Sequence, residues 1–108
     1  MGNRGEITSN KAQQAAAIEE TLQRAMSAVQ GQQPDYAAKL ARDILKQIPN
    51  HPNALHILGY ALLLQERPND AIPLLEKAFR SLRDPAIETQ LAIALRKAFS
   101  SRDRKSVV

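Results

Sequence analysis

The stretch LHILGYALLLQERPNDAIPLLEKAF, residues 55–79, decides the fold. Its first part, up to Leu64, is apolar almost without interruption. Its second part mixes charged residues with apolar ones that recur at helical spacing, namely Ala71, Leu74, Leu75, Ala78 and Phe79. Pro68-Asn69-Asp70 breaks the pattern between the two parts. The stretch therefore predicts a helix buried on most sides, followed by an amphipathic helix with one face in water.

Proline and glycine clusters extend this reading to the whole chain. Ser9 or Asn10 can cap a first helix that ends near Gly31. Four more helices follow from the breaks at Pro34, Pro49 to Pro52, Pro68 and Pro85, and we expect them over residues 35–48, 53–66, 70–82 and 85–99. Pro73 is expected to be tolerable because it lies near the start of its helix. Because each connector has only a few residues, consecutive helices are expected to run antiparallel.

Composition is consistent with a single all-α domain. The chain has 108 residues, of which 44% are hydrophobic, with two Phe, two Tyr and no Trp. Its core must therefore be built from Ala, Leu and Ile, which favour helices. There is no Cys, no apolar run of the roughly 18 residues that a membrane span needs, and no apolar stretch typical of a signal peptide near the start. These features predict a cytoplasmic protein without a membrane span.

Charge is concentrated at one end of the sequence. Residues 96–108 hold five basic residues and one acidic residue, which accounts for the whole net charge of +4. A nucleic-acid-binding domain usually carries a basic face on the fold itself, so nucleic acid is a disfavoured partner. The basic tail is interpreted as a solvated end, and weak binding of an anionic partner, nucleic acid or a membrane surface, stays as an alternative.

Internal repetition predicts the architecture. A shift of 33 residues superposes Leu22, Ala25, Met26 and Val29 on Leu55, Leu58, Gly59 and Leu62, and three of these positions recur as Leu91, Ala92 and Leu95. A shift of 34 residues superposes Ala37, Leu40, Ala41, Ile44, Leu45 and Ile48 on Ala71, Leu74, Leu75, Ala78, Phe79 and Leu82. The odd-numbered helices thus resemble one another, and so do the even-numbered ones.

On these residues the chain resembles a tetratricopeptide repeat (TPR) protein, a family of helix pairs of about 34 residues. The best match is PNHPNALHILGY, residues 49–60, continued by Leu62, Ala71, Ala78 and Phe79. Gly59, Ala71 and Ala78 are expected where the paired helices cross, because small residues allow close approach. The resemblance covers residues 19–99. Departures are Met26 and Ala92 in place of the glycine, Glu88 in place of a large apolar residue, Arg83 in place of a second proline, and no sixth helix.

The resemblance implies antiparallel helical hairpins stacked as a short right-handed α-solenoid of about two and a half TPR units. We expect a flexible terminus over residues 1–9, a helical domain over residues 10–100 and a flexible basic tail over residues 101–108. Within the domain the units are residues 10–49 and 50–83, closed by the helix of residues 85–99. On a helical wheel, seven apolar residues of that closing helix fall in one arc of about 160°, so one face is expected to pack. They are Ile87, Leu91, Ala92, Ala94, Leu95, Ala98 and Phe99.

The resemblance also implies a binding site for a protein or peptide. In this family the first helix of each pair lines a concave groove. The corresponding residues here are Asn53, His56, Tyr60 and Leu63 of the third helix, together with Thr89, Ile93 and Arg96 of the fifth. Gln30, Gln23, Ser27 and Glu20 are the equivalents on the first helix. Ile93 stands out because it is the lone large apolar residue on the polar side of its helix. Alternatively, Tyr60 and Leu63 simply pack against neighbouring helices and Ile93 is a tolerated exposed residue.

Other functions receive less support. Family members that hold a carboxylate use Lys, Arg and Asn in the groove, and only Asn53 and Arg96 match, so a peptide or helix of mixed character is the expected ligand. His51 and His56 do not share a helix face, no Cys completes a metal site, and no catalytic constellation is visible. We therefore expect neither an enzyme nor a cofactor. The alternative to a separate adaptor is an interaction or self-associating segment of a larger protein, such as a bacterial enzyme that carries TPR units.

Overall fold

The fold of the chain was obtained as a computed structural model, which describes the backbone of residues 2–107 and the side chains of residues 12–100. The helices are α1 (Gly2–Gln30), α2 (Pro34–Gln47), α3 (Pro52–Leu64), α4 (Pro68–Leu82) and α5 (Pro85–Val107). Over the described residues there are five helices and no strand, which confirms the predicted all-α fold. α1 begins at Gly2 and α5 runs to Val107, so Ser9 and Asn10 lie within α1 instead of capping it, and both terminal helices extend beyond their predicted ends near residues 10 and 99. The predicted flexible ends, residues 1–9 and 101–108, fall on residues whose side chains the structure does not describe.

Each helix from α2 to α5 begins with proline. Pro34, Pro52, Pro68 and Pro85 all stand at the first helical position, where the missing N–H has no helical partner to lose and the fixed φ suits the helix. The sequence pattern places three of these prolines in the breaks, so α4 starts at Pro68 and not at Asp70. Pro73 is therefore the sixth residue of α4, beyond the first turn in which a proline is free of cost.

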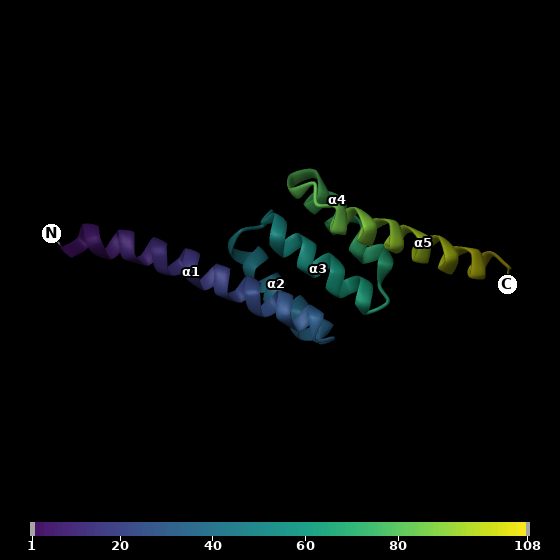
Figure 1. The fold of residues 1–108 in the computed structure, drawn as a ribbon, viewed down its shortest axis with the longest axis horizontal. Helices are drawn as coiled ribbons and strands as arrows, with labels where there is room; N and C mark the ends of the chain where they lie inside the picture. Colours follow the sequence, from purple (N-terminus) through teal and green to yellow (C-terminus); the bar gives the residue numbers. More distant parts are fainter. Residues whose placement is uncertain (1, 108) are drawn as a thin grey trace.

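Two helix ends have the same geometry without glycine. Gln32 and Glu66 follow α1 and α3 with φ of 60° and 63°, in the left-handed region that favours glycine. The next residue then bonds back into the helix, with Gln33 N donating to Ala28 O at 2.7 Å and Arg67 N to Leu62 O at 2.9 Å. These bonds turn the chain sharply, so each following helix runs back along the previous one (Figure 1).

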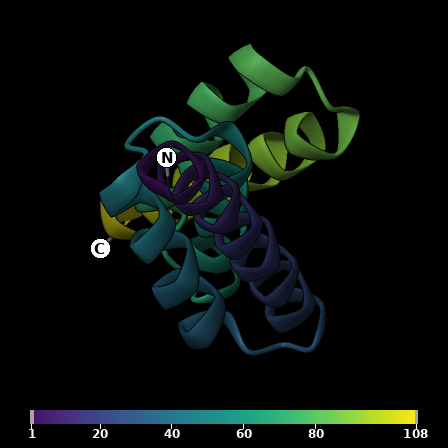
Figure 2. The same ribbon diagram turned by 90° about the vertical axis from the view of Figure 1, so that its left-hand side faces the viewer.

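The central element of the molecule is α3. Figures 1 and 2 show it between the α1–α2 pair and the α4–α5 pair. Each helix packs against its neighbour in sequence, and α3 also contacts α1 and α5. In the described part of the chain neither α1 nor α2 touches α4 or α5. The contacts among α1, α2 and α3 therefore recur, one helix pair later, among α3, α4 and α5.

Burial follows this arrangement. α3 contributes more buried residues than any other helix, as its nearly continuous apolar sequence predicts. The largest fully buried side chains are Ile44 of α2, Leu75 of α4 and Ile87 of α5. No charged or polar residue is buried within residues 12–100. The core is thus one continuous aliphatic cluster with α3 at its centre, and α1, α2, α4 and α5 pack on it.

Candidate functional site

The helix-crossing residues allow α3 and α4 to approach closely. A Cβ atom on Gly59 would lie 2.8 Å from both Cγ and Cδ2 of Leu75 and 3.5 Å from the carbonyl oxygen of Ala71. Ala71, Leu75 and Ala78 are fully buried. The absence of a side chain at Gly59 is therefore what lets Leu75 occupy this crossing.

On α3, the predicted groove residues have different environments. Asn53 is exposed, whereas His56 and Tyr60 are half-buried and Tyr60 packs against the core. Leu63 is only 5% exposed, so its side chain belongs to the core and cannot meet a partner. Leu63 therefore packs against neighbouring helices and is not a groove residue. Because α3 has helices on both sides, fewer of its residues are exposed than its helical wheel suggests.

His56 connects α3 with α5. Its Nε2 lies 2.9 Å from Oε1 of Gln90, a hydrogen bond in which the Nε2–H tautomer donates. Burial lowers the pKa of the His56 imidazole, although the bond to Gln90 and the negative charge of Asp84 act in the opposite direction. The imidazole is thus a fixed polar contact at the seam between the two helices.

On α5, Thr89, Ile93 and Arg96 are exposed. The Thr89 hydroxyl donates to the carbonyl oxygen of Pro85 at 3.0 Å, one turn back in the same helix. The Ile93 side chain is 37% exposed, so a large apolar group lies partly in water at this position. Ile93 therefore stands, as the sequence predicts, as a single large apolar residue among polar ones on this side of α5.

Polar contacts tie α3 to its other neighbours. The Gln65 amide donates to a carboxylate oxygen of Asp35 at the start of α2, and Lys97 Nζ of α5 lies 3.4 Å from Glu66 Oε2. Both contacts are exposed, so each is worth about 1 kcal/mol or less. Together with the His56–Gln90 bond they join α3 and the residues that follow it to α2 and α5, in addition to the packing of the core.

The first helix contributes a hollow of about 540 Å³. It is lined by Glu20, Gln23, Arg24, Ser27, Ala28 and Gly31 of α1 and by Gln33 and Tyr36 at the start of α2. Three of these residues, Glu20, Gln23 and Ser27, are ones that the repeat register assigns to the groove. The hollow therefore adjoins the exposed arc of α1.

The bond between His56 and Gln90 is the feature of the site that sequence reasoning missed. The shift of 33 residues between odd-numbered helices pairs His56 with Thr89, whereas the observed partner lies 34 residues on. The shift found for the even-numbered helices is also 34 and would have selected Gln90. A repeat length of 34 residues, applied to both helix sets, would thus have paired His56 with Gln90.

The described residues offer little for other chemistry. No group of three or more His, Cys, Asp or Glu side chains that could hold a metal occurs among them. Nor does any helix in the described part combine the length and apolarity that a membrane crossing requires. Comparison with family models, with curated proteins and with solved structures finds no match. The packing and the surface of the chain itself are therefore the features that bear on its function.

Proposed function

We propose that the chain is a protein-interaction module of the TPR type, which binds a peptide or short helix of a partner protein in the groove formed by α1, α3 and α5. The observation that carries the proposal is the repeated contact pattern, in which α1, α3 and α5 follow one another as neighbours. Such nearest-neighbour packing is typical of helical solenoids, whose concave faces serve as binding surfaces.

The side chains along this row support a peptide ligand of mixed character. Tyr60 offers an aromatic ring that is partly accessible, and Ile93 offers an exposed aliphatic group on the adjoining helix. Arg96 and Asn53 are exposed and can donate to peptide carbonyls or side chains, and the exposed Thr89 hydroxyl oxygen can accept from a peptide N–H. Aromatic and Arg side chains are the residues that most often dominate the binding energy of protein interfaces.

A peptide selection tests the proposal. Peptides would be selected from a displayed library against the wild-type chain and then titrated against a Tyr60→Ala, Ile93→Ala variant whose fold is verified by circular dichroism. We expect the affinity to fall at least about tenfold, because each residue should contribute more than about 1 kcal/mol if it anchors the ligand.

Leu95→Ala is the matched control, because Leu95 is also an exposed aliphatic residue of α5 but lies on another side of the helix. It should bind the selected peptides as the wild type does. Peptides that bind the double variant and the wild type equally would contradict the groove proposal.

A further inference from the structure

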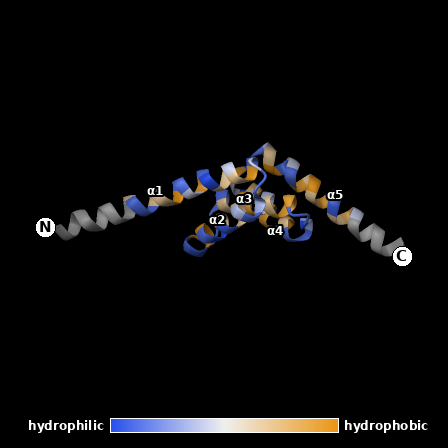
Figure 3. Cartoon of the chain, turned by 90° about the horizontal axis from the view of Figure 1, so that it is seen from below, coloured by the Kyte–Doolittle hydropathy of each residue, from blue (hydrophilic) through white to orange (hydrophobic). Residues whose placement is uncertain are grey.

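The closing helix leaves half of its apolar arc uncovered. Ile87 and Ala94 are fully buried against α3 and α4, and Leu91 and Ala98 are partly buried. Farther around the same arc, Leu95 is 50% exposed and Phe99 is 66% exposed. The packing face predicted for this helix is therefore only partly used. Figure 3 shows hydrophobic residues along α5 up to the part drawn in grey.

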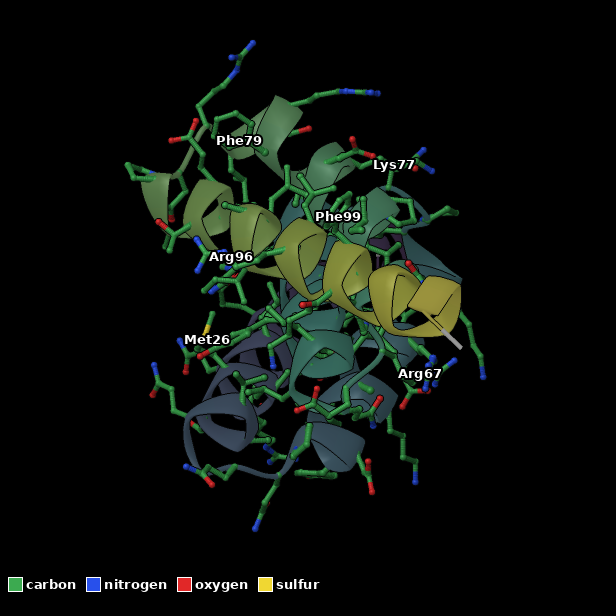
Figure 4. All side chains as sticks on the ribbon, turned by 90° about the vertical axis from the view of Figure 1, so that its right-hand side faces the viewer. Met26, Arg67, Lys77, Phe79, Arg96 and Phe99 are labelled. Atoms are coloured by element: carbon green, nitrogen blue, oxygen red, sulfur yellow. The ribbon has the colours of Figure 1, made fainter. Side chains whose placement is uncertain are left out.

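We define the end face of α5 as Glu88, Ala92, Leu95 and Phe99. At 100° per residue these four positions share one side of the helix, roughly opposite the side that carries Gln90, whose amide meets α3. Their spacing of four, three and four residues is that of a two-helix seam. Arg96 lies about 60° round the helix from Phe99, at the edge of the end face. Both residues are labelled in Figure 4, which looks at the molecule from the α5 end.

Charge along α5 selects the orientation of a partner helix. Asp84 and Glu88 lie at the start of the helix, whereas Arg96 lies further on, next to the end face. Lys97, the next basic residue, is already engaged with Glu66 of the α3–α4 connection. A second α5 helix running antiparallel would bring Glu88 of one copy near Arg96 of the other, twice over. A parallel pair would instead place like charges side by side.

We propose that two copies of the chain associate through the end faces of α5, with the two helices antiparallel. With the two-fold axis midway between Ala92 and Leu95, each Leu95 lies over the partner's Ala92, a large side chain against a small one. Arg96 then reaches the partner's Glu88 within one helical turn. The same axis sets Phe99 level with the partner's Glu88, so that Phe99 covers the methylene stem of Glu88 while the Glu88 carboxylate turns toward Arg96. Each contact occurs twice, as a two-fold interface requires.

The size of the end face sets the strength of the pair. One leucine, one phenylalanine and one alanine per copy fall well below the roughly 800 Å² per partner of a standard stable complex. The dimer is therefore weak and concentration-dependent. It leaves the groove residues Tyr60 and Ile93 free but engages Arg96, which the proposed groove also contains.

Sedimentation equilibrium over a range of concentrations tests the interface. The wild type is expected to dimerise reversibly, and Leu95→Asp and Phe99→Asp are expected to be monomeric. Both residues are largely exposed, so neither change should affect the fold, which circular dichroism verifies. Ile93→Asp is the matched control, because it places the same charge on the same helix outside the end face, and it should dimerise like the wild type. A monomeric wild type, or a dimer that only Ile93→Asp dissociates, would overturn the proposal.

Charge reversal adds an independent test of the ion pair. Arg96→Glu and Glu88→Arg should each weaken the dimer, since each places two like charges opposite one another. The double variant restores opposite charges and should restore the wild-type association. Failure of the double variant to recover would exclude the proposed pairing of Glu88 with Arg96.

Disulfide trapping tests the orientation. The chain has no Cys, so single introduced cysteines report only on the designed contact. A mixture of Ala92→Cys and Leu95→Cys chains should crosslink faster than either variant alone, because the antiparallel pair brings these two positions together within the roughly 7 Å between Cα atoms that a disulfide spans. Faster crosslinking of each variant with itself would indicate a parallel pair and overturn the antiparallel arrangement.

Discussion

At the scale of single residues, two positions show how the packing of α3 sets both stability and chemistry. Gly59 is the residue whose missing side chain lets α4 approach, and His56 is the half-buried titratable group at the seam with α5. Both lie on the same helix, three residues apart. Substitutions of Gly59 therefore probe the contact of α3 with α4, and substitutions of His56 probe its contact with α5.

Gly59→Ala should destabilise the fold by about 1–3 kcal/mol despite the better helix propensity of alanine. The added methyl group would lie 2.8 Å from Leu75, which is fully buried, so Leu75 must shift against its neighbours in the core to make space. Urea denaturation of Gly59→Ala, of Leu75→Ala and of the double variant measures the effect. We expect the double variant to be more stable than the sum of the single effects predicts; strict additivity would show that the two side chains do not compete for the same space.

His56 should make folding stability depend on pH. Its pKa in the folded chain is lowered from 6.5 mainly by burial, so the unfolded chain binds the proton more readily. Stability is therefore fully present above the unfolded pKa and decreases as the pH falls through 6.5 toward the lowered folded pKa. His56→Gln should lose less stability between about pH 7.5 and pH 5 than the wild type in urea denaturation.

His51→Asn provides the control for this experiment. It removes the other imidazole and keeps a side chain that can cap α3 as His51 does, where Nδ1 accepts from Ala54 N at 3.3 Å. The part of the pH dependence that His56→Gln removes should remain in this variant. A pH dependence that disappears with His51 and persists without His56 would contradict the assignment.

At the scale of helices, the sequence predicted the number and order of elements correctly, while their starts were less accurate. A proline in the sequence is typical of a break, but it fits the first helical position as well as a connector, so the pattern alone cannot separate the two. The same limit applies to helix faces. Neighbouring helices determine which residues of α3 are exposed and which residues of α5 are packed. A helical wheel, drawn from the sequence of one helix, does not show where those neighbours lie. Leu63 was therefore assigned to the surface and Leu95 to the core side.

The early start of α4 makes Pro73 a destabilising residue. As the sixth residue of the helix it leaves the carbonyl oxygen of Asn69 without its helical N–H donor. Because Pro73 is exposed, Pro73→Ala can restore this bond without disturbing the core. We expect a gain of about 1–3 kcal/mol in the free energy of unfolding, measured by urea denaturation.

Pro68→Ala is the matched control for Pro73→Ala. Pro68 stands at the first position of the same helix, where no helical N–H bond is missing, so its replacement should bring no comparable gain. Equal stabilisation by the two substitutions would show that the effect does not depend on helix position.

At the scale of the whole molecule, the contact pattern makes α3 the only helix that touches all four others in the described part of the chain. A chain held together by nearest-neighbour contacts can open from its ends, so its stability need not be uniform. Sequence repetition predicts this arrangement but does not fix the register between the helices. A shift of one residue in the repeat decides whether Thr89 or Gln90 faces His56, and the structure shows that it is Gln90.

Native-state hydrogen exchange tests whether the two ends behave independently. Ile87 of α5 and Ile44 of α2 are both buried at opposite ends of the core, and Ile→Val at either should cost about 1 kcal/mol. If the ends open separately, Ile87→Val should reduce protection in α5 and α4 but leave α1 and α2 almost unchanged, and Ile44→Val should do the reverse. Amides of α3 should stay the most protected in both variants, since α3 is covered from both sides. Equal loss of protection in every helix would mean that all five open as one cooperative unit, and the stacked arrangement would then describe the shape of the molecule without describing its energetics.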